Sequence, residues 1–234
     1  MKLSEKFLPS LLIAVGIAVS GFCIKSGMDS FAAKERVVSV RGLAEREVKA
    51  NKVTWPIQFK VVGDELNAVY NSIQKNNAAI IEFLKKNGVK DDEISVNAPD
   101  LTDMEAERYV NNIRYRYNVS QVIVVVSNDV DKISNLIMRQ TELLKQGVAI
   151  AASDYQYKVS YEFTELNSIK PEMIAEATKA ARIAGEQFAK DSDSELGKIK
   201  KATQGQFSIE NRDENTPYIK KVRVVSYVEF FIED

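Results

Sequence analysis

Histidine is absent from this chain of 234 residues, and only one cysteine is present. The missing histidine removes the commonest general base, the commonest metal ligand and the side chain that titrates closest to neutral pH. Ser-His-Asp and Cys-His catalytic mechanisms are therefore excluded. The single cysteine, Cys23, lies in a hydrophobic segment, so the rest of the chain has no disulfide, no thiol nucleophile and no cysteine-based zinc site.

A charge excess of either sign is also missing. The chain has 32 lysines and arginines against 33 aspartates and glutamates, so no global field attracts nucleic acid or an anionic surface. The GxGxxG, Walker A and GxSxG patterns of nucleotide-binding loops and nucleophile elbows do not occur. A hydrophobic fraction of 45% is nevertheless enough for a globular core.

One long uncharged run lies near the N-terminus, from Phe7 to Ile24, and is preceded by Lys2 and Lys6. About 18 apolar residues, each rising ~1.5 Å along a helix, nearly span a hydrocarbon core of about 30 Å. This length exceeds that of an ordinary signal-peptide core. The run therefore predicts one hydrophobic helix.

We expect residues 1–33 to form an N-terminal tail and membrane anchor or signal segment. In the anchored form, residues 7–24 lie in the cytoplasmic membrane of a bacterial envelope and residues 34–234 lie in the periplasm. The alternative is a cleaved signal and a soluble periplasmic domain, because Ser30 and Ala32 place small residues at the two cleavage positions.

Residues 34–234 alternate between the period of strands and the period of helices. Gly42 interrupts the first strand pattern, and Pro56 marks the second as an edge strand or a bulge. The predicted strands are 36–41, 47–62, 94–96, 112–127, 155–163, 196–209 and 218–232.

Three segments follow a helical period. The first runs from an Asp64 N-cap to Asn87-Gly88, and the second from Asn128 or Asp129 to Gly147. The third begins near Pro171 and carries an alanine stripe suited to close packing on a sheet or a sister helix. We predict an α+β fold with a largely antiparallel sheet and three packed helices, preceded by one N-terminal hydrophobic helix. Since no low-complexity linker occurs, we expect 34–234 to be one domain.

Acidic residues gather at three places, without the spacing that a site requires. Asp191 to Glu195 alternates oxygen ligands as a calcium loop does, but Leu196 stands where the sharp turn needs glycine. Asp91 to Glu93 and the acidic residues of 100–107 do not place two carboxylates around a substrate. We interpret them as solvated loops and helix ends, and we identify no catalytic, cofactor-binding or metal-binding residue.

Arginine and tyrosine alternate around the start of the fourth predicted strand, a combination that can bind single-stranded nucleic acid. On a strand, the arginines fall on one face and the tyrosines on the other, so the two chemistries point apart. We therefore expect a solvated face above an aromatic core face and no nucleic-acid partner. The residues are Arg108, Tyr109, Arg114, Tyr115, Arg116 and Tyr117.

The order of elements and several local strings resemble the SIMPL-domain family of bacterial envelope proteins. The opening strand of that family, Val-Ser-Val-x-Gly-x-x-Glu, is similar to 38–45. A helix ending in Leu-Lys-x-x-Gly-Val before an acidic-Ile strand matches 84–94, and a tyrosine-led strand before an Asp-capped helix matches 117–133. The alanine-rich helix and its Leu-Gly-Lys match 175–198. Ala50-Asn51 stands where the family usually has Pro-Asp, so we expect that turn to differ.

The resemblance implies an exported, often membrane-associated α+β protein linked to oxidative-stress defence or envelope integrity and, in some relatives, to ring-like oligomers. It supplies no catalytic residues. We expect a non-enzymatic envelope protein that forms a homo-oligomer, because two strands look like edges and the alanine-rich helix can dock against a copy of itself. A metal- or carboxylate-dependent hydrolase and an oligomeric ring or pore-like assembly are the alternatives, and the sequence names no small-molecule ligand. An oxidative-stress role would not be a thiol peroxidase reaction, because the only cysteine lies in 7–24.

Overall fold

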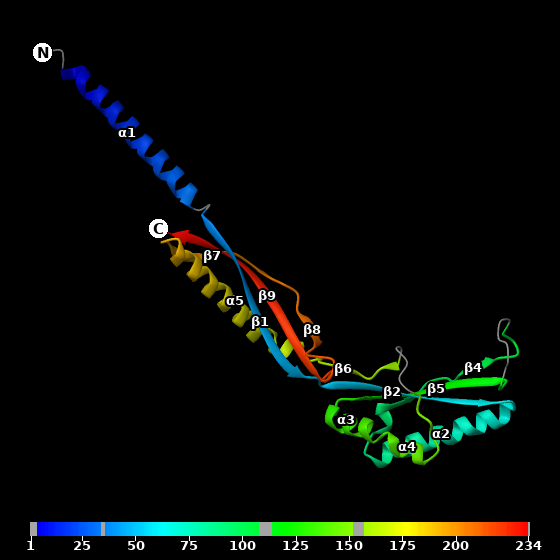
Figure 1. The fold of residues 1–234 in the computed structure, drawn as a ribbon. Coiled ribbons are helices and arrows are strands. Elements are labelled where there is room, and N and C mark those ends of the chain that lie inside the picture. Colours follow the sequence, from blue (N-terminus) through cyan, green and yellow to red (C-terminus); the bar gives the residue numbers. More distant parts are fainter. Residues whose placement is uncertain (1–3, 34–35, 108–113, 152–156, 234) are drawn as a thin grey trace. The chain divides into compact units, whose positions relative to one another are not determined.

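The structure, a computed structural model, describes residues 4–33, 36–107, 114–151 and 157–233. It is an α+β protein with antiparallel sheets and an N-terminal helix, which confirms the predicted fold class (Figure 1). Two compact units make up the chain, and we describe each by itself. The first unit comprises 1–46, 167–208 and 222–234, and the second comprises 47–166 and 209–221.

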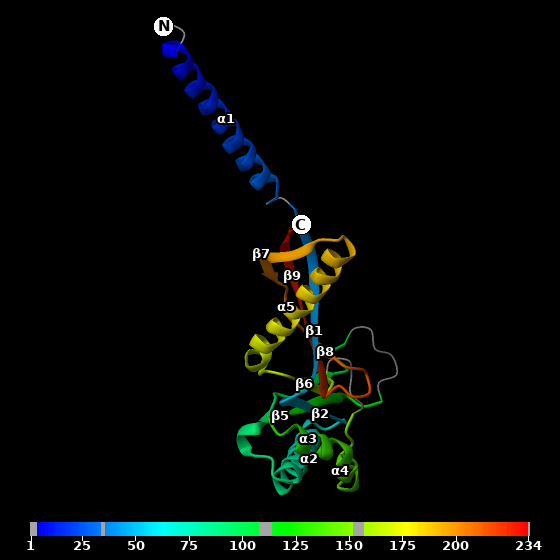
Figure 2. The ribbon, with the colours of Figure 1, turned by 90° about the vertical axis from the view of Figure 1, so that its left-hand side faces the viewer.

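The first unit combines a sheet with one long helix. The sheet has the order β1 (Val37–Lys49), β9 (Ile219–Glu233) and β7 (Glu195–Gln204). β8 (Ser208–Asn211), of which residues 209–211 belong to the second unit, also pairs with β9. The last strand therefore pairs with its predecessors, as the sequence pattern predicts. α5 (Leu166–Asp191) runs alongside β1 and β9 (Figures 1 and 2).

A row of buried residues on α5, four of them alanine or glycine, faces this sheet. Five buried residues spaced four apart form the row, and Ala181 packs with Val40, Val228 and Phe230 in one cluster. The row consists of Met173, Ala177, Ala181, Gly185 and Ala189. Of the two expected uses of the alanine stripe, the structure shows packing on the sheet. The expected start at Pro171 is wrong, since α5 begins at Leu166 and includes the proline, whose missing N–H removes one helical hydrogen bond.

Gly42 does not end the first strand, contrary to the sequence-based expectation. β1 continues through it to Lys49. A Cβ atom at Gly42 would lie 1.8 Å from the carbonyl oxygen of Ala177 and 2.4 Å from the backbone nitrogen of Ala181. The glycine is therefore required where the backbone of a helix lies directly on a strand.

The second unit contains a sheet of order β3-β5-β2-β6, with β4 also paired to β5. Its centre is the antiparallel ladder of β2 and β5, which runs from Val53↔Ser127 to Gly63↔Tyr117. The buried core lies between this sheet and the helices, and includes Trp55, Phe59, Ile80, Leu84 and Ile133. The elements are β2 (Lys52–Gly63), α2 (Leu66–Lys86), η1 (Asp91–Glu93), β3 (Ile94–Val96), β4 (Asp100–Asp103), β5 (Tyr117–Ser127), α3 (Val130–Arg139), α4 (Thr141–Lys145) and β6 (Ser160–Glu162).

Most of the expected helix ends are present in this unit. Asp129 caps α3 by accepting a hydrogen bond from the Lys132 N–H at 3.1 Å. Gly88 and Gly147 follow α2 and α4 with φ of 81° and 82°, the left-handed conformation that glycine adopts without strain. The second predicted helix is divided into α3 and α4 at Gln140.

The predicted Asp64 cap is wrong. Glu65 occupies the N-cap of α2 and makes no side-chain capping bond. The Asp64 carboxylate instead accepts a hydrogen bond from the Arg116 N–H at 3.0 Å, because the residue before β5 offers a backbone donor beside the end of β2.

The tyrosine-led part of β5 is not an edge, contrary to the expectation. Tyr117 to Ser120 pair with β2 on one side and with Asp100 to Asp103 of β4 on the other. Residues 112–113 and 155–156 of the predicted strands lie outside the described residues, as do Arg108 and Tyr109.

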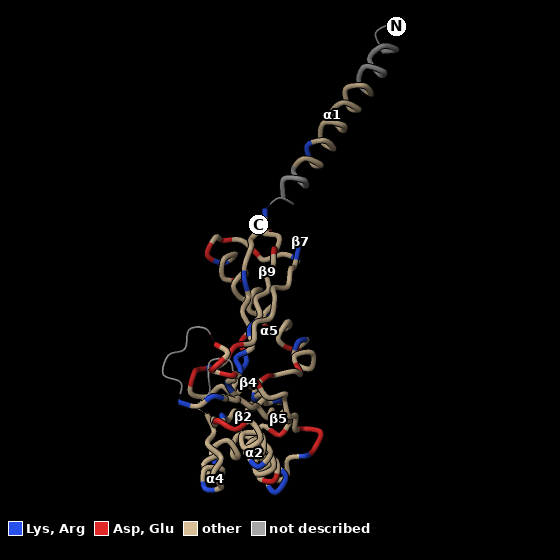
Figure 3. Tube along the Cα trace, turned by 90° about the vertical axis from the view of Figure 1, so that its right-hand side faces the viewer, with Lys and Arg blue, Asp and Glu red and all other residues tan. Residues whose placement is uncertain are grey.

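α1 (Ser4–Ala33) is helical over the N-terminal segment. From Leu12 to Met28, where side chains are described, the large apolar residues are 52–74% exposed and Lys25 is the one charged residue (Figure 3). A search of the described residues finds no helix with the length and hydropathy to span a membrane.

The Gly42→Ala substitution is expected to destabilise the protein by about 3 kcal/mol or more, at the upper end of the overpacking range, since both close atoms belong to the α5 backbone. Ser39→Ala, on the exposed side of β1, is the control and is expected to change stability little. Denaturant unfolding of both variants checks this. A Gly42→Ala protein as stable as the control would contradict the close approach.

Candidate functional site

The acidic residues singled out in the sequence do not converge on a site. Within the described ranges no group of three or more histidine, cysteine or acidic side chains is placed to hold a metal ion. Asp191 ends α5, Asp193 adopts a φ of 49°, and Glu195 begins β7. The segment that resembles a calcium loop is therefore the turn between a helix and a strand.

Two acidic residues of the 100–107 segment, Asp103 and Glu105, are bound by one arginine. Arg116 donates to the Asp103 carboxylate at 3.0 and 3.3 Å and lies 3.1 Å from the Glu105 carboxylate. The hydrogen bond from Arg116 lowers the pKa of Asp103. These ionised groups stabilise the loop before β5, and a general acid would need the opposite pKa shift.

Glu93 is the acidic residue with the most buried surroundings in the 91–93 run. Burial opposes its ionisation, but hydrogen bonds from the Lys90 N–H and the Ser127 hydroxyl outweigh burial and lower its pKa. The carboxylate thus links η1 to the end of β5, which is a structural role.

The arginines and tyrosines before β5 lie together, contrary to the expected separation. Residues 114–116 precede the strand, so strand alternation does not apply to them. The Arg114 guanidinium lies 5.5 Å from the centre of the Tyr115 ring, and that of Arg116 lies 5.0 Å from the Tyr117 ring. Because Arg116 is also bound to two carboxylates, little of its charge remains available to a partner.

The loop between β8 and β9 is organised around Asp213. Its carboxylate accepts from the backbone N–H groups of Asn215 and Thr216 at 2.9 and 2.8 Å, from the Thr216 hydroxyl and from Arg212 at 2.9 Å. The Thr216 hydroxyl and Arg212 are the main causes of a pKa lowered to about 2. This polar loop lies between the segments 196–209 and 218–232, which the sequence predicts as strands.

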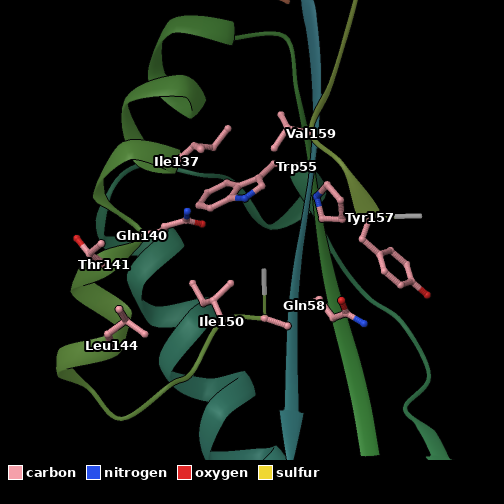
Figure 4. A pocket seen from close by; sticks show the side chains of 11 residues that line it. Trp55, Gln58, Ile137, Gln140, Thr141, Leu144, Ile150, Tyr157 and Val159 are labelled. Atoms are coloured by element: carbon pink, nitrogen blue, oxygen red, sulfur yellow. The ribbon is translucent and has the colours of Figure 1, made fainter. Parts of the chain in front are cut away.

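A cavity of about 430 Å³ lies in the second unit at an edge of β2 (Figure 4). We call it the β2-edge cavity. Its lining residues come from β2, α3, α4 and the segments around 150 and 158, and none of them is charged. They are Trp55, Pro56, Gln58, Ile137, Gln140, Thr141, Leu144, Ile150, Ala151, Tyr157 and Val159.

The cavity exists because β2 lacks a strand partner at this point among the described residues. The ladder with β6 ends at Thr54, and the next contact on this edge is the bridge between Phe59 and Ile150. The Gln58 carbonyl accepts from the Ala151 N–H at 2.8 Å on the same edge. Alternate residues of a strand direct their backbone groups to the same side, so the backbone nitrogen of Pro56 faces the same edge as the Gln58 carbonyl. This nitrogen carries no hydrogen and cannot donate to another strand. The expectation that Pro56 marks an edge is thus correct for this part of β2.

Gln58 is the unusual polar residue of the cavity. It is 5% exposed, and its amide nitrogen donates to the Ser120 hydroxyl at 2.8 Å. The amide oxygen is buried and has no hydrogen-bond partner among the described residues. An unpaired buried acceptor costs about 1–3 kcal/mol, so its presence requires an explanation.

A second candidate is the face of the first-unit sheet opposite α5. It alternates apolar and charged residues, with Leu43 and Tyr227 each 44% exposed. Arg41 lies 5.1 Å from the centre of the Tyr227 ring, and Arg223 lies 3.5 Å from Glu45. We call this surface the open face. It comprises Ser39, Arg41, Leu43 and Glu45 of β1 and Arg223, Val225, Tyr227 and Glu229 of β9.

These features define an α+β protein with antiparallel sheets, one uncharged cavity and one open sheet face among the parts described. The sequence matches the SIMPL family, described as a protein of unknown function (DUF541), over residues 38–227. The chain belongs to this family, and the resemblance seen in the sequence is confirmed. The comparison with curated proteins gave no match.

Asp213→Ala is expected to lower stability at neutral pH and to matter progressively less in acid. The folded-state pKa of about 2 is below the ordinary value of 3.8, so ionised Asp213 stabilises the fold above 3.8 and loses this effect as the pH falls toward about 2. Unfolding free energies of wild type and variant should therefore converge on acidification. Glu214→Ala, in the same exposed loop, is the control. A difference that stays constant from neutral to acidic pH would contradict the assignment.

Proposed function

We propose that this protein is a non-enzymatic component of the bacterial envelope that self-associates through its open face. The observation that carries the proposal is the composition of that face. Apolar side chains lie exposed on it between charges of both signs, whereas an ordinary solvated sheet face is mainly polar.

The charges of the open face are complementary to a second copy of the same face. Arg223 and Glu229 lie equally far from Ser226 along β9. Suppose that the open faces of two copies stack with their β9 strands antiparallel and their Ser226 residues at the same height. Arg223 of one copy then lies opposite Glu229 of the other, and Val225 lies opposite Tyr227. Sheets that stack face to face in this way interdigitate their side chains, and a two-fold axis uses the same residues twice.

The distribution of charge supports a role in binding rather than catalysis. Lysines and arginines are interspersed with aspartates and glutamates along both units (Figure 3). Ion pairs such as those of Arg46 with Glu172 and Glu176 have exposed or half-exposed side chains and lie on the surface. Pairs of this kind organise loops and helices and contribute little energy.

We further propose that residues 7–24 hold the protein in the cytoplasmic membrane, with residues 34–234 in the periplasm. The uncharged run of 18 residues supports this, as do the apolar side chains exposed around the described part of α1. A cleaved signal remains the alternative outcome. Any role in envelope integrity or oxidative-stress defence would then be indirect, because the only thiol, Cys23, lies in the same run.

Arg223→Glu is expected to weaken self-association about tenfold or more, because it places two acidic residues opposite each other across the proposed interface. The exchange Arg223→Glu with Glu229→Arg should restore association, since it re-forms the opposite-charge pair with reversed signs. Light scattering of the full chain in mild detergent, over a range of concentrations, measures the mass.

Lys179→Glu is the matched control, because it reverses the same charge on exposed α5, away from the open face. It should leave the mass unchanged. A monomer at every concentration would refute self-association. Association that is unaffected by Arg223→Glu, or not restored by the exchange, would place the interface elsewhere.

Ile17→Arg is expected to release the protein from the membrane fraction, since a charge at the centre of a spanning helix costs about 2.5–3.5 kcal/mol. Ser26→Arg, outside residues 7–24, is the control and should stay in the membrane. Two reporters fused in turn after residue 234, one active only in the periplasm and one active only in the cytoplasm, test the orientation. Activity of the cytoplasmic reporter alone would overturn the proposed orientation, and a soluble wild-type protein with a new N-terminus near residue 33 would show cleavage.

A further inference from the structure

The second unit contains a further cavity beside α3, with a volume of about 450 Å³. Six residues of α3 line it, together with Tyr161 of β6 and Asn215, Pro217 and Tyr218 of the loop between β8 and β9. We call it the α3 cavity. Its volume lies within the roughly 300–1,000 Å³ that is usual for small-molecule sites. Because the open face belongs to the first unit, a site in the α3 cavity is separate from that face and goes beyond the proposed function.

Two tyrosine rings form a corner of the cavity wall. The ring centres of Tyr161 and Tyr218 lie 6.2 Å apart, and the ring planes meet at 69°. The Tyr161 hydroxyl lies 3.3 Å from the Ser134 hydroxyl, and this hydrogen bond holds the ring against α3. Tyr218 is 37% exposed, so a ligand in the cavity can reach its ring. An aromatic face offers a flat apolar surface to the flat side of another ring.

Exposed side-chain amides add hydrogen-bonding groups to this corner. Asn135 of α3 and Asn215 both line the cavity, and neither makes a side-chain hydrogen bond among the described residues. A side-chain amide presents both a donor and an acceptor whichever way it is turned, so its orientation does not change what it offers to a ligand. Groups of this kind pair with hydroxyls, which also donate and accept hydrogen bonds.

The one charged residue among those that line the α3 cavity already has a partner. The Asp131 carboxylate accepts two hydrogen bonds from the Lys49 ammonium, at 2.6 and 2.5 Å. Both side chains are exposed, so solvent screens the charge that this pair leaves uncompensated. The described lining therefore favours a neutral ligand over an ion, while the remaining lone pairs of the carboxylate can still accept from a hydroxyl.

We propose that the α3 cavity binds a pyranose sugar, either free or as one unit of a glycan. A pyranose carries C–H groups on the flat side of its ring and hydroxyls around its rim. The flat side stacks on the exposed Tyr218 ring, and the hydroxyls bond to the amides of Asn135 and Asn215. A flat aromatic compound lacks the hydroxyls, and an open-chain polyol lacks the flat side. The pyranose is the class of ligand that uses both features of the corner.

The probes are two disaccharides, cellobiose and N,N′-diacetylchitobiose, added to the full chain in a detergent whose headgroup contains no sugar. Saturation-transfer NMR measures binding and identifies the sugar protons that lie nearest to the protein. We expect saturable transfer to at least one disaccharide, strongest at the C–H protons of one side of the ring, and at least tenfold weaker binding of the open-chain polyol sorbitol. No saturable transfer to either disaccharide up to the solubility limit would overturn the proposal, as would equal binding of sorbitol.

Two variants with matched controls locate the site. Tyr218→Ala removes the exposed ring and should weaken disaccharide binding about tenfold, whereas Tyr70→Ala, on exposed α2 outside the cavity, should not. Asn135→Ala removes one hydrogen-bonding group and should weaken binding about fivefold, whereas Asn71→Ala on α2 should not.

Thermal unfolding verifies that each of these variants is folded. If Tyr218→Ala misfolds because it loses the contact with Tyr161, Asn135→Ala decides the question. Binding by folded Asn135→Ala that equals that of Asn71→Ala would refute the site. Retention of the wild-type protein on insoluble cellulose or chitin would identify a glycan as the source of the sugar, and binding of the disaccharides alone would identify a free sugar.

Discussion

The contact of two backbones at Gly42 is the constraint on which the first unit depends. The α5 carbonyl of Ala177 lies where a side chain would begin on β1, so the helix can rest on the sheet only through a row of residues no larger than alanine at this point. Such close packing buries the central part of one face of β1 and β9, as Val40, Val224, Val228 and Phe230 show. Among the described elements of this unit, α5 is the one helix that packs on the sheet. The face of the sheet opposite α5 is therefore exposed.

The second unit shows a different solution to sheet packing. Its central ladder is long and regular, and helices α2 and α3 cover the apolar side of β2 and β5. The irregularity occurs where the short β6 stops and a proline follows in β2. A proline on this edge removes the backbone donor that would pair with another strand, so it discourages strand addition at this point. Gln58, in the same part of β2, keeps a buried amide oxygen without a hydrogen-bond partner among the described residues, at a cost of about 1–3 kcal/mol.

Local signals in the sequence identified much of this fold. The helix ends at Gly88 and Gly147 and the cap at Asp129 depend on the conformation or hydrogen bond of one residue, and these could be read directly. The role of Gly42 could not be predicted from the sequence, because a glycine in a strand indicates either the end of the strand or the close approach of another backbone. The helix that approaches it lies about 135 residues further along the chain. Asp64 was misread for a related reason, since its carboxylate found a backbone donor in a distant segment instead of the adjacent helix. The β2-edge cavity was missed because its walls combine residues near 55, 140 and 158, and no single pattern contains them.

The first unit is assembled from three separate stretches of the chain, and this has a consequence for its biogenesis. β1 is made early, whereas its neighbour β9 lies at residues 219–233. During synthesis or export, the apolar surfaces of β1 and of the alanine row of α5 stay exposed until β9, the last strand, has been made and pairs with β1. Contacts of such large sequence separation form slowly and leave intermediates open to aggregation. The second unit is mostly contiguous and can fold earlier, so we expect the nascent protein to depend on a chaperone chiefly for the helix and strand that complete its first unit.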